Sequence, residues 1–152
     1  MTRVSSEPLY TVGVAAQMVG TSPQTLRLYE NEGLILAHRT ESNQRRYSDV
    51  EIAKVRCIQK MIREEGMNFS GLRHLFALIP CWELRDCPEE DHEKCPAFLN
   101  RTGPCWAMAE KCLHPLDSCR DCAVYLETTD CSELKDLLFR ARRSESERGT
   151  GL

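Results

Sequence analysis

Apolar residues recur at helical spacing near the start of the chain. In "TVGVAAQMVG", residues 11–20, Thr11 occupies the position expected for an N-cap and Gly20 the position expected for a helix end. The apolar positions between them fall one, three or four residues apart, at Val14, Ala15, Met18 and Val19. This spacing predicts a short amphipathic helix.

A second helix is predicted directly after the first, in "TSPQTLRLYENEGL", residues 21–34. Ser22 is a suitable N-cap, Pro23 suits the first helical position, and Gly33 is expected to end the helix. Leu26 is expected to face the core, with Leu28 as a further candidate. Two short helices joined by a tight turn form a helix-turn-helix, a motif that places its second helix in the major groove of DNA.

The next segment alternates less regularly and is rich in polar and basic residues. "LILAHRTESNQRRYSD", residues 34–49, predicts a short hairpin, or wing, with a basic rim. Asp49 is the expected cap of a third helix, "VEIAKVRCIQKMIREEG", and Ser70 the expected cap of a fourth, "GLRHLFALI". Cys57 lies in the third helix, where we expect it to be a small buried hydrophobic residue.

Two stretches, "YTVGVAAQMVGTSPQTLRLYENEGL" and "RRYSDVEIAKVRCIQKMIREEGMNFSGLRHLF", resemble the MerR family of bacterial transcription regulators. The resemblance covers residues 9–79 and implies a winged helix-turn-helix that binds double-stranded promoter DNA as a homodimer. It places candidate DNA-binding residues on or beside the recognition helix, at Gln24, Thr25, Arg27 and Tyr29. It places others in the wing, gripping the DNA backbone, at Arg45, Arg46 and Tyr47.

The second half departs from that family, whose members usually continue into a long helix that pairs across the dimer. Pro80, Pro88 and Pro96 exclude a long helix there, so the mode of dimerisation is left open. "SELKDLLFRARR", residues 132–143, predicts a short amphipathic helix that packs either on the module or on a second subunit. Residues 144–152 read as a flexible tail.

Cysteine is concentrated in this second half. Eight of the nine cysteines lie beyond residue 80, and residues 81–98 align with residues 105–125 as a near-repeat with one Cys-Trp step in each copy. The alignment pairs Cys81 with Cys105, Cys87 with Cys112, and Cys95 with Cys122. Cys119 and Cys131 have no counterpart in the first copy.

These eight cysteines are the candidate metal ligands. Zinc is usually bound by short C-x₂₋₄-C pairs, and only Cys119 and Cys122 have that spacing. Iron–sulfur clusters accept more varied spacing and Cys-Pro steps, which occur at Cys87 and Cys95. An iron–sulfur cluster is therefore the leading expectation and zinc the alternative. Disulfide or thiol switching without metal, and inert thiols, remain open. His92 and His114 are possible substitute ligands, more simply read as exposed loop residues.

Charge divides the chain in the same way as cysteine. Residues 1–79 carry ten Lys and Arg against eight Asp and Glu, whereas residues 80–152 carry ten against fifteen. The first part is the better partner for a polyanion. "MTRVSSEPLY" contains no apolar signal segment and no apolar run suits a membrane helix, so a cytoplasmic location without membrane contact is expected.

The expected architecture is mainly α. It comprises a winged helix-turn-helix domain over residues 9–79, a small cysteine-rich, loop-rich module over residues 80–131, and the short C-terminal helix. The expected function is a transcription regulator, not an enzyme, whose cysteine module senses redox state, metal or cluster status. The alternatives are a thiol or electron-transfer enzyme, favoured by the C-x-x-C at Cys119 and Cys122, or a DNA-binding protein with a purely structural zinc module.

Overall fold

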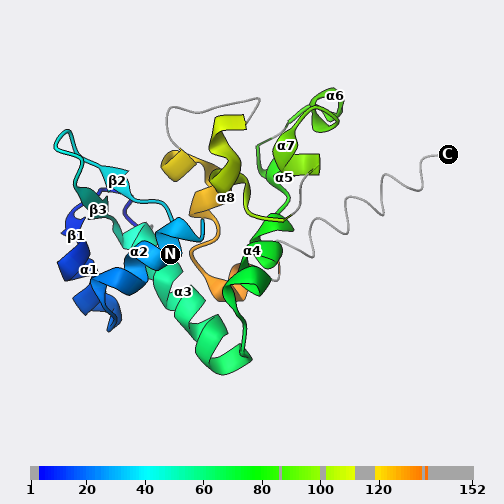
Figure 1. Cartoon of the computed structure of the whole chain (residues 1–152). Coiled ribbons are helices and arrows are strands. Elements are labelled where there is room, and N and C mark those ends of the chain that lie inside the picture. The colour runs from blue at the N-terminus through cyan, green and yellow to red at the C-terminus, as the bar shows by residue number, and fades with distance from the viewer. Residues whose placement is uncertain (1–3, 86, 100–101, 112–118, 135, 137–152) are drawn as a thin grey trace.

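The computed structural model describes residues 4–85, 87–99, 102–111, 119–134 and 136, and in that part the chain is mainly α (Figure 1). The reading head, a name used here for residues 10–78, holds four helices and three short strands. The helices are α1 (Val12–Val19), α2 (Pro23–Asn31), α3 (Asp49–Glu65) and α4 (Phe69–Ala77). The strands are β1 (Tyr10–Thr11), β2 (His38–Arg39) and β3 (Arg45–Tyr47).

The predicted helix-turn-helix is present, and its ends are set by local hydrogen bonds. Thr11 Oγ1 accepts the backbone N–H of Val14 at 3.3 Å, which caps α1. The turn is made by Gly20, whose φ of 68° lies in the left-handed region that glycine adopts without strain. Ser22 Oγ then accepts the N–H of Thr25 at 3.2 Å and caps α2. Both caps agree with the sequence-based prediction.

The wing is also present, as a three-stranded antiparallel sheet with strand order β1-β3-β2. The hairpin pairs His38 with Arg46 and Arg39 with Arg45. Its tip contains Asn43 at a φ of 60°, a conformation that Asn tolerates better than most residues. Strand β1, which the sequence pattern did not predict, pairs Tyr10 with Tyr47 and joins the start of the domain to the wing.

Two helix starts differ from the prediction. The N-cap of α3 is Ser48 rather than Asp49, because the Ser48 N–H donates to Glu51 Oε2 at 2.7 Å in a capping box. The N-cap of α4 is Asn68 rather than Ser70, because Asn68 Oδ1 accepts the N–H of Gly71 at 2.8 Å. In both cases the capping residue lies slightly earlier in the chain than predicted.

Within the described residues, the cysteine module consists of short helical segments, and no long helix runs through Pro80, Pro88 and Pro96, as predicted. Its elements are α5 (Cys81–Leu84), α6 (Glu89–His92), α7 (Pro96–Leu99), two 3₁₀ segments, η1 (Cys105–Lys111) and η2 (Cys119–Asp121), and α8 (Ala123–Leu126). In Figure 1 the segment around α8 lies between the side of the molecule that carries α2 and the side that carries α4 and α5.

The module is not a separate body. Trp106, Val124 and Tyr125 are almost fully buried and belong to the same hydrophobic cluster as Leu34 and Ile58 of the reading head. Burial of this apolar surface holds the two parts together. The C-terminal helix expected over residues 132–143 lies mostly outside the described residues, as does the tail at residues 144–152; Leu134, within that stretch, is buried.

Candidate functional site

The recognition helix α2 exposes part of the set predicted to bind DNA. Gln24 and Arg27 are exposed and Thr25 is half-buried. Tyr29 is 5% exposed and packs edge-on against the ring of Phe69, with centroids 5.7 Å apart. The prediction that Tyr29 contacts DNA directly is therefore corrected: its side chain packs inside the domain and supports α2. The expectation for Leu28 was also wrong, because this side chain is 41% exposed on the outer face.

The wing arginines are held by an acidic residue of the recognition helix. Glu30 Oε2 accepts a hydrogen bond from Arg45 Nε at 2.6 Å, and Glu30 Oε1 lies 3.5 Å from Arg39 Nη2. Arg46 donates to Gln44 Oε1 at 3.3 Å. Glu30 was not among the residues predicted from the sequence, because Glu30 and Arg45 are 15 residues apart and no local pattern indicates that they pair. The pair sets the position of the wing relative to α2.

Tyr47 does not lie on the surface of the wing as predicted. Its side chain is fully buried, and its hydroxyl is a buried polar atom without a hydrogen-bond partner within the described residues. Burial, followed by the nearby Glu30 carboxylate, raises the pKa of Tyr47 to about 12. The Tyr47 ring therefore supports the wing from the interior of the domain. The prediction that Tyr47 contacts the DNA backbone is corrected.

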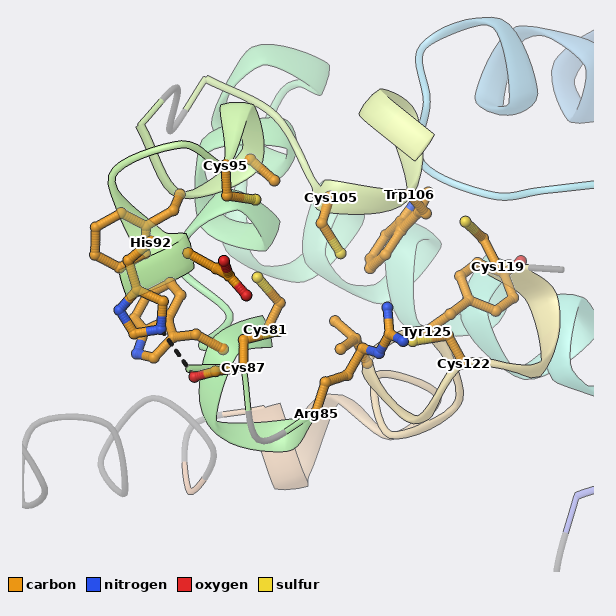
Figure 2. Close-up of a pocket in the computed structure, with 15 residues that line it drawn as sticks. Cys81, Arg85, Cys87, His92, Cys95, Cys105, Trp106, Cys119, Cys122 and Tyr125 are labelled. Carbon is orange, nitrogen blue, oxygen red and sulfur yellow. Dashed lines mark hydrogen bonds between the residues drawn. The ribbon is translucent and has the colours of Figure 1, made fainter. Parts of the chain in front are cut away.

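Six cysteines line a pocket in the module (Figure 2). They are present as thiols, and they are Cys81, Cys87, Cys95, Cys105, Cys119 and Cys122. Each lies within or shortly before a short helical segment, and cysteines from both copies of the near-repeat line the same pocket. In Figure 2 the first three lie on one side of the pocket and the last two on the other, with Cys105 between them.

The pocket has an aromatic and apolar wall. Trp82, Phe98, Trp106 and Tyr125 line it together with Val124. Its volume is about 60 Å³, and a single water needs roughly 10–15 Å³ by the same measure. The pocket is therefore larger than one ion or one water molecule.

Cys81 and Cys105 are hydrogen-bonded to each other inside the pocket. This bond lowers the pKa of Cys81, whereas the same bond, followed by burial and by the sulfurs of Cys81, Cys122 and Cys119, raises the pKa of Cys105. Of the two thiols of this pair, Cys81 is therefore the more acidic.

One of the eight predicted ligands does not line this pocket, and a second lies outside the described residues. Cys131 forms a disulfide with Cys57 of α3, with Cα atoms 5.5 Å apart, so its prediction as a ligand was wrong. Cys57 is buried as expected but is disulfide-bonded rather than a simple apolar residue. Cys112 lies outside the described residues, as does His114. His92 is half-buried rather than exposed; it stacks on Phe98, with centroids 4.7 Å apart.

A buried polar network joins the module to α3. Glu51 Oε2 accepts from Arg120 Nη2 at 3.3 Å, and Glu51 Oε1 accepts from the Tyr125 hydroxyl at 3.1 Å. Arg120 is only 9% exposed and Glu51 1% exposed. The sequence analysis missed this network because its members are 69 to 74 residues apart.

Two pocket residues also touch the segment that connects α2 to the wing. Trp106 Nε1 donates to the carbonyl of Gly33 at 2.8 Å, and the Tyr125 hydroxyl accepts the N–H of Leu36 at 3.0 Å. The approach at Gly33 is close, because a Cβ atom there would lie 3.0 Å from Ala107 Cβ, and its φ is 74°. The end of the recognition helix and the base of the wing are thus hydrogen-bonded to the wall of the cysteine pocket.

The reading head has recognisable relatives. The family model described as MerR HTH family regulatory protein matches residues 10–78. Residues 10–78 are thus similar to the helix-turn-helix domain of the MerR family.

Each of two curated relatives also matches about half of the chain. A putative heat shock protein HspR from Streptomyces coelicolor is 41% identical over 71 residues, which is 47% of this chain and 47% of that protein. The HTH-type transcriptional regulator GlnR from Bacillus anthracis is 26% identical over 73 residues, 48% of this chain and 56% of that protein. The chain thus spans about half the length of the curated relatives it matches.

The chain also has a distant similarity to a solved structure. It is the crystal structure of HiNmlR, a MerR family regulator lacking the sensor domain, bound to promoter DNA. It covers 93% of this chain and 94% of its own, with 21% identity and a TM-score of 0.40. A TM-score of that size does not establish a common arrangement of the two parts. Separately, no helix within the described residues has the length and apolar content needed to cross a membrane.

Lys54 of the reading head is buried against the module. Its ammonium lies 4.5 Å from the centroid of the Trp106 ring and 4.1 Å from that of Tyr125, and it donates to Thr128 Oγ1. Burial lowers the pKa of Lys54 to about 7, while the charges of Glu51 and Cys105 act in the opposite direction. Lys54 is therefore a cation held next to the pocket wall at a cost in solvation.

This lowered pKa predicts a pH-dependent stability. Between the folded pKa of about 7 and the ordinary value of 10.5, the unfolded chain binds more protons than the folded chain, so the free energy of unfolding rises with pH. We expect the wild type to gain up to about 2–3 kcal/mol relative to Lys54→Met between pH 7 and pH 9. Urea denaturation of both proteins across this range measures the difference, and a difference independent of pH would contradict the assignment.

Proposed function

We propose that the protein is a DNA-binding transcription regulator in which the state of the cysteine pocket controls how the MerR-family domain binds promoter DNA. One observation carries the proposal. Trp106 and Tyr125 line the pocket and also hydrogen-bond to Gly33 and Leu36, which lie between the recognition helix and the wing. A change in the pocket therefore has a direct mechanical route to the DNA-reading elements.

The route is short and well packed. Trp106 follows Cys105 directly, and Tyr125 is three residues after Cys122. The two rings contact each other edge-on, with centroids 5.3 Å apart, and the ammonium of Lys54 lies over both. Coupling between two sites needs an element that both sites contact, and this aromatic pair contacts both.

The DNA-binding part of the proposal rests on the domain and on its charge. Gln24 and Arg27 are exposed on α2, and Arg39 is exposed on the wing. Arginine side chains bind phosphate, whereas side chains near the start of a recognition helix read base edges. A single small reading head offers little contact area, so the protein is proposed to bind an inverted repeat as a homodimer.

A thiol–disulfide or electron-transfer enzyme is the second candidate, because Cys119 and Cys122 form a C-x-x-C. Cys122 is only 8% exposed, at the bottom of the pocket wall. A thioredoxin-like C-x-x-C lies in a βαβ setting, and the described residues of the cysteine module contain helical segments and no strand. This difference favours the regulator.

The experiment for this proposal uses Tyr125→Phe, which removes one hydroxyl and leaves every cysteine in place. We expect oxidation of the wild type with diamide to change its DNA affinity by about 5–150-fold, the usual range for coupled sites, and dithiothreitol to reverse the change. In Tyr125→Phe the response should shrink while the fully reduced protein still binds DNA. Fluorescence anisotropy with labelled operator DNA measures both.

The matched control is Cys57→Ser, which removes the disulfide to Cys131 and leaves all six pocket thiols. It should retain the response to diamide. A response that is lost in Cys57→Ser but kept in Tyr125→Phe would assign the control of DNA binding to the disulfide and refute the proposed route.

A further inference from the structure

The pocket is too wide for a single metal ion. A zinc ion with sulfur ligands at about 2.3 Å in a tetrahedron holds those sulfurs about 3.8 Å apart. Among the described residues, no three His, Cys, Asp or Glu side chains converge closely enough to hold one ion. Yet six thiols line one hollow whose volume exceeds that of an ion. A larger, multi-atom occupant fits this arrangement better.

Four of the six thiols face the pocket from different sides. In Figure 2 Cys105 lies between Cys81 on one side and Cys119 and Cys122 on the other. These four come from three separate segments, namely α5, the start of η1 and the turn from η2 to α8, so they surround the space instead of lining one edge. Cys87 and Cys95 lie on the same side of the pocket as Cys81 (Figure 2), and of these three Cys81 is hydrogen-bonded to Cys105.

The surroundings suit an anionic group shielded from water. Arg85 lines the pocket, and its charge acts on Cys81. The Lys54 ammonium lies over the Trp106 and Tyr125 rings, which line the pocket. A cluster with four thiolate ligands carries net negative charge, and its stability depends on nearby cations and on exclusion of solvent. Both are provided here.

We propose that Cys81, Cys105, Cys119 and Cys122 bind an iron–sulfur cluster in this pocket. Each thiol releases its proton to solvent as its sulfur binds iron, and the cluster's inorganic sulfide fills the space between the four side chains. Cys87 and Cys95 are lining residues, not ligands. The inference deepens the proposed function, on which its regulatory meaning rests, by naming what occupies the pocket.

The first test needs no substitution. Full-length protein is purified without oxygen, or its metal-free form is reconstituted with ferrous iron and sulfide, and iron, acid-labile sulfide, zinc and the visible spectrum are measured. Equal amounts of iron and sulfide with a brown charge-transfer spectrum are expected. Mass spectrometry after alkylation should find the four ligand cysteines protected and Cys95 modified. Zinc as the bound metal, no metal uptake, or protection of a different set of cysteines would overturn the proposal.

The second test replaces each ligand with serine and compares it with Cys95→Ser. In Cys105→Ser and Cys122→Ser the affinity for iron should fall at least about tenfold, because removing a ligand or its support typically costs 10–100-fold in affinity. Cys95→Ser should retain its iron. Equal loss in Cys95→Ser would refute the ligand set, and circular dichroism of the metal-free proteins separates loss of a ligand from loss of folding.

The two proposals can fail separately. If the protein binds iron and sulfide but removal of the cluster does not change DNA affinity, the cluster proposal stands and the regulatory function is refuted. If the protein takes up neither iron nor sulfide but its DNA affinity still responds to diamide through Tyr125, the regulatory function stands and the cluster proposal is refuted.

Discussion

Replacing Glu51 with alanine is expected to lower the free energy of unfolding by about 3–5 kcal/mol, because removal of one partner leaves a buried charge uncompensated. Arg120 and the Tyr125 hydroxyl both donate to this carboxylate, as does the N–H of Ser48. All three donors are buried or nearly so, and water cannot replace the lost acceptor without opening the contact between module and reading head. Urea denaturation at constant redox state measures the loss.

Glu64→Ala is the matched control for Glu51→Ala. It removes an exposed carboxylate from the same helix, α3, and surface substitutions of this kind usually change stability by less than about 0.5 kcal/mol. The double variant Glu51→Ala with Arg120→Met should lose less than the sum of the single losses, because the buried charge is removed with its partner. Equal losses for Glu51→Ala and Glu64→Ala would contradict the network.

The second large effect is on DNA affinity. Arg45→Ala is expected to weaken binding to every DNA sequence by about tenfold at physiological salt, and to reduce the salt dependence of binding by about one phosphate contact. Arg45 lies in the wing and is aligned by Glu30 at 2.6 Å. Gln24→Ala should act differently, changing the preference at one base pair by about 1–3 kcal/mol.

Lys94→Ala removes the same charge from an exposed position in the cysteine module and should leave both affinity and salt slope unchanged. Electrophoretic or anisotropy titrations at several salt concentrations, on operator and on unrelated DNA, separate the three variants. If Arg45→Ala and Lys94→Ala behave alike, the wing does not contact phosphate.

Local structure was predictable where a short-range hydrogen bond decides it. Thr11 and Ser22 cap their helices as the sequence indicated, and the hairpin lies where its polar stretch predicted. Tyr47 was misjudged for a reason that strand geometry supplies. Side chains alternate along a strand, so Arg46 and Tyr47 in β3 point to opposite faces, and one of them had to point inward.

The cysteine pocket was only partly predictable. The near-repeat correctly grouped cysteines from both copies, because equivalent positions of two similar segments pack around a shared space. It gave no reason to include Cys119, which lines the pocket all the same, or to pair Cys131 with Cys57 across 74 residues. The Glu51–Arg120 contact is equally long-range. Such pairs depend on the tertiary fold and leave no mark in local sequence.

The bond between Cys57 and Cys131 has a topological consequence. It closes a covalent loop from residue 57 to residue 131. This loop contains α4, the six pocket cysteines, and Trp106 and Tyr125, which hydrogen-bond to the segment between α2 and the wing. Closing a ring of this length restricts the unfolded chain by about 4.5 kcal/mol in the loop-entropy account. Both ends of the ring meet at one point on α3. Cleavage of the backbone anywhere between Cys57 and Cys131 would leave the two fragments joined, and the pocket would stay attached to the helix-turn-helix domain.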